Sequence, residues 1–131
     1  MIMLAGEYFK SRALSFKNAF SGLAYVLRTQ RNAWIHLVFT ASVIILGVFL
    51  KVTGYGWALI IFAFGIVWIA EILNTALEVL VDLASPEKHP LAKICKDVGA
   101  AAVLIAALTS VAIGLCVLGP PLASKISVVF Q

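Results

Sequence analysis

The sequence predicts an all-α membrane protein with three transmembrane helices and an N-terminal amphipathic surface helix. Of its 131 residues, 63% are hydrophobic and 12% charged, against about 45–50% apolar and 25% charged residues in soluble domains. The apolar residues also form runs long enough to cross a bilayer, and short polar segments separate these runs. We expect a single domain over residues 1–131.

The surface helix is predicted over residues 7–29. Apolar and basic side chains follow one another there with approximately helical spacing. This mixture is typical of a helix that lies in the membrane interface, with its apolar face toward the acyl chains. A merely solvated N-terminal helix is the alternative that the pattern leaves open. The basic residues of the segment are Lys10, Arg12, Lys17 and Arg28.

Three apolar runs predict the transmembrane helices, at about residues 34–50, 57–83 and 91–118. Each run is followed by residues that favour turns or stop helices. The second run is unusual because its last third carries acidic residues while the helical pattern continues. The boundaries are the turn residues 51–56 after the first run, Ser85-Pro86 after the second and Gly119-Pro120-Pro121 after the third.

The basic residues predict the orientation in the membrane. The N-terminal segment carries five of them and residues 84–97 carry three, whereas the first loop and the C-terminal tail carry one each. The positive-inside rule therefore places the N-terminus and the second loop in the cytosol, and the C-terminus outside. Because these residues flank apolar runs and form no basic patch with interleaved aromatics, we expect a membrane-surface role and no nucleic-acid partner.

A polar stripe lies on the second predicted span. At about 100° per residue, Glu71, Asn74, Glu78 and Asp82 fall on one face of the helix and extend about 16 Å along its axis. A charged residue at the centre of a bilayer costs about 2.5–3.5 kcal/mol on insertion scales. Such residues are therefore candidates for function.

Cationic groups are predicted at the same level as the stripe. Lys93, Lys96 and Asp97 begin the third helix, where the helix dipole favours anions. Acids and bases together suit a metal-bound nucleotide, because phosphoryl transfer needs charge stabilisation and a base near the attacking hydroxyl. Buried ion pairs that fix helix orientation are the alternative. The sequence contains neither a G-x-x-x-x-G-K-[ST] loop nor a zinc-site spacing.

Three segments resemble the signature of the prokaryotic diacylglycerol kinase family. They are EILNTALEVLVD at residues 71–82, HPLAK at residues 89–93 and KDVGAAAVL at residues 96–104. Upstream, Arg31-Asn32 and His36 are similar to the form found in Gram-positive-type undecaprenol kinases. The resemblance covers nearly the whole chain.

The resemblance implies an enzyme of lipid metabolism in the bacterial inner membrane. It would be a homotrimer with active sites shared between neighbouring chains, and would use MgATP to phosphorylate a lipid alcohol, either diacylglycerol or undecaprenol. Carried onto this sequence, Glu71 would be the catalytic carboxylate and base. Glu78 would bind Mg²⁺ and ATP, supported by Asn74 and Asp82. Glu87, Lys88 and His89 would border the nucleotide, and Lys96 and Asp97 would contact it.

The chain departs from the family pattern at Gln30. Many relatives have a second metal-binding glutamate between a threonine and an arginine-asparagine pair, whereas this chain reads Thr29-Gln30-Arg31-Asn32. An amide oxygen can bind Mg²⁺ but adds no negative charge, so Gln30 is retained as a candidate ligand. The alternative function is a non-enzymatic small membrane protein, such as a proton-coupled transporter that uses Glu71 or an assembly factor.

Overall fold

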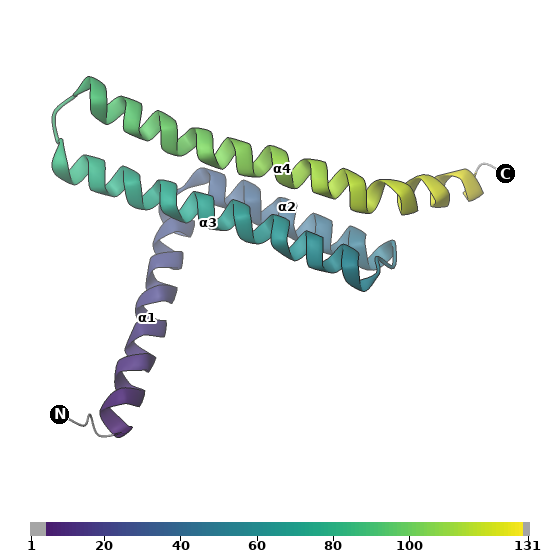
Figure 1. Ribbon diagram of the computed structural model, residues 1–131, viewed down its shortest axis with the longest axis horizontal. Coiled ribbons are helices and arrows are strands. Elements are labelled where there is room, and N and C mark those ends of the chain that lie inside the picture. Colours follow the sequence, from purple (N-terminus) through teal and green to yellow (C-terminus); the bar gives the residue numbers. More distant parts are fainter. Residues whose placement is uncertain (1–4, 130–131) are drawn as a thin grey trace.

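The computed structural model describes residues 5–129, which form four helices joined by short connections (Figure 1). The first helix joins the N-terminal end of the second and extends away from the other three helices, which run alongside one another. This confirms the all-α fold with three helices long and apolar enough to span a membrane. The helices are α1 (Ala5–Thr29), α2 (Arg31–Phe49), α3 (Gly54–Ala84) and α4 (Pro90–Val129).

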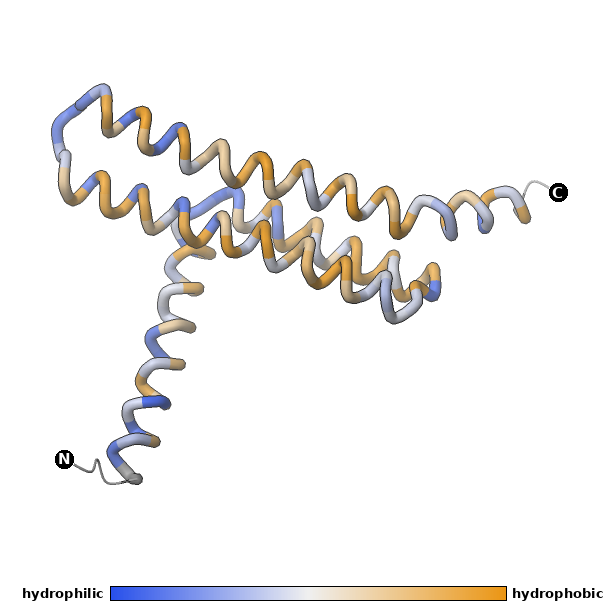
Figure 2. Tube along the Cα trace, in the orientation of Figure 1, coloured by the Kyte–Doolittle hydropathy of each residue, from blue (hydrophilic) through white to orange (hydrophobic). Residues whose placement is uncertain are grey.

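The three spanning helices differ in length. α2 has 19 residues and is about 28 Å long at 1.5 Å per residue, close to the thickness of a hydrocarbon core. α3 has 31 residues and reaches about 46 Å. Figure 1 shows α3 and α4 extending together beyond α2 at the α3–α4 connection, and Figure 2 shows that this end is hydrophilic while the middle is apolar. The last turns of α3 therefore reach the membrane surface.

α3 packs mainly against α4. Small residues such as Ala63 on α3 and Ala106 on α4 are buried between the helices, which lets the two backbones approach closely in lipid. The Ser110 hydroxyl of α4 donates a hydrogen bond to the Ala63 carbonyl at 2.7 Å. This pair places residues 63 and 110 at the same level of the two antiparallel helices.

The end of α4 differs from the sequence prediction. The helix was expected to stop at residue 118, but it continues through Pro120 and Pro121 to Val129. Proline lacks an N–H, so a proline inside a helix removes one of its backbone hydrogen bonds and usually ends or kinks the helix. Beyond the prolines, Lys125 donates a hydrogen bond to the Phe49 carbonyl at the end of α2 (3.0 Å), and its Nζ lies 3.8 Å from the Phe49 ring centroid. These contacts stabilise the turns of α4 that follow residue 118.

Candidate active site

Three polar side chains of α3 are buried between the helices. Glu71 is 1% exposed, Asn74 7% and Thr75 2%. Counted from Gly54, Glu71 lies about 26 Å along α3, so a 30 Å hydrocarbon core that begins near Gly54 places its carboxyl near the opposite boundary. Glu78 follows half-buried and Asp82 exposed. The predicted stripe therefore runs from the buried interior out to the membrane surface.

Glu71 faces His36 of α2. Its Oε2 lies 3.7 Å from His36 Nε2, beyond ordinary hydrogen-bond length. Neither atom has a hydrogen-bond partner among residues 5–129, and both atoms are buried. Leaving a buried polar atom unpaired costs roughly 1–3 kcal/mol. Each of the two side chains therefore has one buried atom without a hydrogen bond, and the two atoms face each other.

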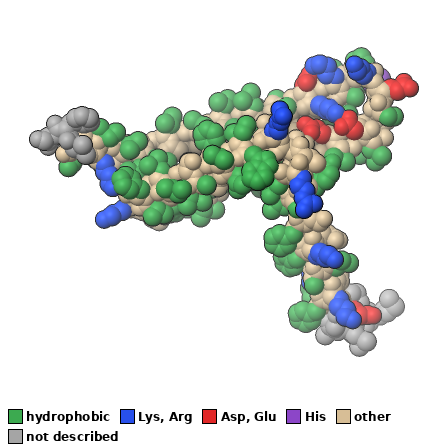
Figure 3. Space-filling model, turned by 180° about the vertical axis from the view of Figure 1, so that it is seen from behind, with side chains coloured by type: hydrophobic (Ala, Val, Ile, Leu, Met, Phe, Trp, Pro, Cys, Tyr) green, Lys and Arg blue, Asp and Glu red, His purple; other side chains and the backbone are tan. Residues whose placement is uncertain are grey.

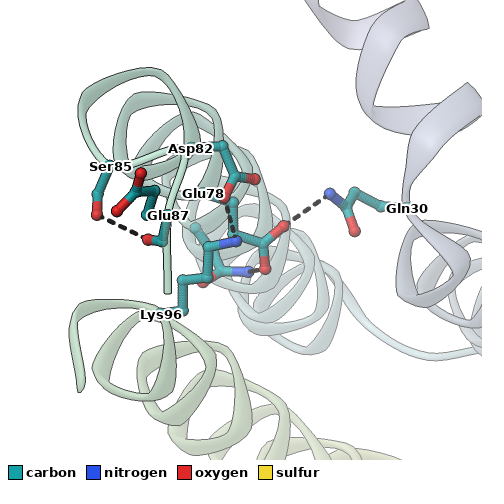
Figure 4. A network of polar contacts seen from close by, with 7 residues as sticks. Gln30, Glu78, Asp82, Ser85, Glu87 and Lys96 are labelled. Carbon is teal, nitrogen blue, oxygen red and sulfur yellow. Dashed lines mark hydrogen bonds and ion pairs between the residues drawn. The ribbon is translucent and has the colours of Figure 1, made fainter. Parts of the chain in front are cut away.

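The Glu78 carboxylate is held by two amides (Figure 4). Gln30 Nε2 donates to Oε2 at 3.0 Å, and Asn74 Nδ2 donates to Oε1 at 3.0 Å. Gln30 is the single residue between α1 and α2, with an extended backbone. The two hydrogen bonds fix the position of the Glu78 side chain and join it to the junction of α1 and α2.

Gly99 of α4 allows this arrangement. A methyl group on its Cα would overlap the Asn74 Oδ1 atom, so only glycine lets α4 pass over the Asn74 side chain. Asn74 Oδ1 is buried and has no hydrogen-bond partner within the described chain. The Asn74 oxygen therefore packs against Gly99 of α4 while the amide nitrogen holds Glu78.

Charged side chains gather at the α3–α4 connection (Figure 3). A hollow of about 560 Å³ lies there. Lys96 Nζ is 2.5 Å from Asp82 Oδ1, which joins α4 to α3, and Lys93 Nζ is 2.5 Å from Asp97 Oδ2. His89 Nδ1 accepts a hydrogen bond from the Leu91 N–H (3.2 Å) at the start of α4. The polar lining consists of Asp82, Ser85, Glu87, Lys88, His89, Lys93, Lys96 and Asp97.

The predicted site residues thus fall into two neighbouring groups. Glu71, Asn74, Glu78 and Gln30 lie together at the inner end of the stripe. Glu87, Lys88, His89, Lys96 and Asp97 line the hollow, and Asp82 pairs with Lys96 beside it. Between residues 5 and 129, no cluster of three or more His, Cys, Asp or Glu side chains is arranged to hold a metal ion.

Two further residues of the site, His36 and Gly99, make contacts that the sequence did not predict. His36 was named for its similarity to undecaprenol kinases, and its place beside Glu71 depends on how α2 packs on α3. Gly99 lies in the segment KDVGAAAVL, but its contact with Asn74 was not predicted. Polarity in an apolar run was the available signal for His36.

Comparisons with known proteins show the family to which the chain belongs. Residues 17–118 match the family described as prokaryotic diacylglycerol kinase. A diacylglycerol kinase of Synechocystis is 43% identical over 112 residues, which are 85% of this chain and 64% of that relative's length. An undecaprenol kinase of Bacillus subtilis is 38% identical over 82% of this chain and 88% of its own. A diacylglycerol kinase of Escherichia coli is 34% identical over 73% and 84%. The chain therefore belongs to the prokaryotic diacylglycerol kinase family, whose relatives named above are kinases of lipid alcohols.

Proposed function

We propose that the chain is an ATP-dependent lipid kinase that transfers the γ-phosphate of MgATP to the hydroxyl of diacylglycerol or undecaprenol. The observation that carries this proposal is the buried Glu71 carboxyl, which lies on the same helix face as the polar stripe that leads to the charged hollow. A lipid hydroxyl reaches the carboxyl from the membrane, and a nucleotide reaches the hollow from water. Membership of the family supports the same activity.

Glu71 is the proposed general base. Phosphoryl transfer needs a group that takes the proton of the attacking hydroxyl as its oxygen bonds to phosphorus. Glu71 Oε2 makes no hydrogen bond within the described chain, so a movement of the buried side chain that admits a hydroxyl breaks no hydrogen bond of this atom. Because His36 Nε2 lies 3.7 Å away, the same hydroxyl oxygen can also contact the imidazole.

The hollow is the proposed nucleotide site. Lys88 and Lys96 would stabilise phosphate oxygens, while Glu87 and His89 would border the nucleotide. Asp97 is paired with Lys93, and Lys96 with Asp82, each at 2.5 Å. These ion pairs are exposed and therefore contribute about 1 kcal/mol or less each. A bound polyphosphate can replace the carboxylates as the partner of the lysines at small cost.

The site contains oxygen donors that fit Mg²⁺. Glu78 supplies a carboxylate, which Gln30 and Asn74 hold in position through their amide nitrogens. Rotation of the Gln30 amide about its last bond would present a second oxygen. Mg²⁺ accepts such ligands and usually completes its shell with water and substrate phosphates. When bound, it would neutralise charge on the transferring phosphate.

The Gln30→Glu variant tests this metal site. A second carboxylate would stand where an amide now lies 3.0 Å from Glu78. We expect a tighter apparent Mg²⁺ affinity, because hard cations prefer anionic oxygens. Without Mg²⁺ we expect a lower melting temperature, since a hydrogen bond worth about 1 kcal/mol is replaced by repulsion between two carboxylates.

The readouts are the Mg²⁺ dependence of activity and, separately, of the melting temperature in detergent. Gln30→Leu is the control, because it removes the hydrogen bond without adding charge. It should lower the melting temperature, and Mg²⁺ should raise that temperature less than it does in Gln30→Glu. If Gln30→Glu binds Mg²⁺ no more tightly than the wild type, Gln30 is not a ligand.

We further propose a homotrimer with shared sites in the bacterial inner membrane, with the N-terminus and the α3–α4 connection in the cytosol and the C-terminus outside. The charges of the α3–α4 connection lie at the end of the bundle from which α1 leaves (Figure 3). The basic residues of α1 and of the α3–α4 connection can therefore lie on one side of the membrane, as the positive-inside rule expects. Glu78 is half-buried and Asp82 exposed in the single chain, so neighbouring copies can add groups to the site.

The function is tested by transfer of labelled phosphate from ATP. Purified protein in mixed micelles receives diacylglycerol or undecaprenol, with and without Mg²⁺. We expect Mg²⁺-dependent formation of a phosphorylated lipid from at least one acceptor. Absence of transfer to both lipids would contradict the proposal and leave a non-enzymatic membrane protein as the better explanation.

A further inference from the structure

The Glu71 carboxyl has one basic partner in the described chain. Its Oε2 lies 3.7 Å from His36 Nε2, and no Lys or Arg side chain among residues 5–129 forms an ion pair with it. Both atoms are buried, and neither makes a hydrogen bond within these residues. Because 3.7 Å is too long for a hydrogen bond, the two side chains interact through their charges.

Two contacts set the register of α2 against α3. Gln30, at the start of α2, donates to Glu78, and His36 faces Glu71. The two levels are about 9 Å apart along α2 and about 10 Å apart along α3, as expected for antiparallel helices in contact at both levels. Ala33, midway between Gln30 and His36, is fully buried. The placement of His36 beside Glu71 therefore follows from how the two helices pack.

Within residues 5–129, the other elements around Glu71 bring no positive charge to it. Residue 63 of α3 is level with residue 110 of α4, so residue 71 is level with about residue 102, and α4 carries only apolar or small side chains from 98 to 107. On α3 the next ionisable group toward the hollow is Glu78, a like charge. The charged side chains of the flanking segments are Arg28, Arg31 and Asp97, which are exposed, and Lys96, which is paired with Asp82.

We propose that His36 is a positioning residue for the base, and that its imidazolium charge keeps the buried Glu71 carboxyl ionised. The inference rests on the proposed function and deepens it. A carboxyl that is removed from water is costly to ionise unless a positive charge lies close to it. Only the ionised carboxyl can accept the proton of the lipid hydroxyl. His36 thus acts on the reaction through Glu71.

The proton of the lipid hydroxyl passes to Glu71 in this step. The O–H bond of the hydroxyl breaks, its oxygen bonds to the γ-phosphorus, and ADP leaves with the electron pair of the broken P–O bond. His36 keeps its own proton throughout. The imidazole therefore contributes before the transfer, when the carboxyl must carry its charge.

Three variants of α2 test this role. His36→Gln removes the charge and keeps a polar side chain. His36→Lys restores a positive charge without the imidazole ring. Thr40→Val is the control, because Thr40 lies one turn further along the same helix, is likewise half-buried, and its replacement changes no charge. The melting temperature and the elution volume in detergent show that each variant is folded.

The first readout is kcat as a function of pH, with lipid and ATP both saturating. In His36→Gln the acid limb of this profile should move to higher pH by about 1–3 pH units, the usual effect of a lost charge partner on a carboxyl. On that limb kcat should fall by about tenfold or more relative to the wild type, and the loss should disappear as the pH rises. The KM of the lipid should stay near the wild-type value. His36→Lys should return the limb toward its wild-type position, and Thr40→Val should not move it.

A second substitution shows whether His36 acts through Glu71. In the Glu71→Gln background there is no carboxyl to keep ionised, so adding His36→Gln should change the remaining rate by less than about twofold. Independent effects of the two substitutions would multiply. They would show that His36 serves the reaction by another route.

The second readout does not need activity. The ¹⁵N NMR signals of the histidine rings in micelles, assigned with the help of His89→Gln, report whether His36 carries a proton on one or on both ring nitrogens. We expect both nitrogens to be protonated near neutral pH in the wild type, and one in Glu71→Gln. In that variant a neutral amide faces the ring, which then releases its second proton.

Three results would overturn the inference. A loss of kcat in His36→Gln that is equal at every pH would leave His36 with a structural role only. A higher KM of the lipid with an unmoved acid limb would assign His36 to the lipid instead. A His36 ring with one proton in the wild type would contradict the charge pairing even in a protein without activity. A doubly protonated ring in a wild type that phosphorylates no lipid would instead refute the proposed function, and the positioning role with it.

Discussion

Replacing Glu71 by Gln should lower the rate of phosphate transfer by about 10²–10⁴-fold, the usual contribution of general acid–base catalysis. Glutamine has the same shape but cannot accept the proton of the lipid hydroxyl. The melting temperature in detergent should stay equal or rise, because an unpaired carboxyl that is 1% exposed is replaced by a neutral group. Activity and stability would then change in different directions.

The two measurements are the initial rate with labelled ATP and the melting temperature of the same preparation. Glu7→Gln makes the same chemical change on the exposed surface of α1 and should leave both values near those of the wild type. A Glu71→Gln protein that retains more than a tenth of the activity would refute the role as base. A large loss of stability would assign Glu71 to the fold instead.

Replacing Gly99 by Ala should destabilise the protein by about 1–3 kcal/mol, the usual cost of overpacking a tight contact, and should also reduce activity. The new methyl group would overlap Asn74 Oδ1. The Asn74 side chain must then move, and the hydrogen bond that it donates to Glu78 at 3.0 Å is lost. The variant would therefore reduce activity because the Glu78 carboxylate is no longer held in position.

A double-mutant cycle tests whether the effect of Gly99→Ala depends on the Asn74 side chain. Asn74→Ala removes the side chain that Gly99→Ala would meet, so Gly99→Ala should cost little in the Asn74→Ala background, and the two free-energy changes should not add. Gly65→Ala is the control, since a Cβ there would meet no atom within 4 Å and alanine favours the helix. Additive effects of Gly99→Ala and Asn74→Ala would show that the two residues act independently.

The spans and the stripe could be predicted because each depends on one helix alone. Runs of apolar residues set the lengths of α2 and α3, and the helical repeat places Glu71 and Asn74 on one face. The end of α4 could not be predicted in the same way. The contact between Lys125 and Phe49 joins residues far apart in the sequence, so the pattern of a single helix could not reveal it.

Contacts between helices were the hardest part to predict. A repeat of 3.6 residues fixes which side chains share a face, but not which residue of another helix lies opposite. His36 and Gln30 approach Glu71 and Glu78 only through the packing of α2 and its junction with α1 against α3. The sequence named Gln30 as a candidate ligand, whereas its observed bond to Glu78 is a donor contact.

The position of Gln30 connects α1 directly to the candidate active site. α1 has 25 residues, so it is about 37 Å long, and it joins the bundle at Gln30, one of the two residues whose side chains donate hydrogen bonds to Glu78. A tilt of α1 that turned the Gln30 backbone would also shift the hydrogen bond from Gln30 to Glu78. A change in the lipid packing around α1 would then reach a carboxylate of the site through this hydrogen bond.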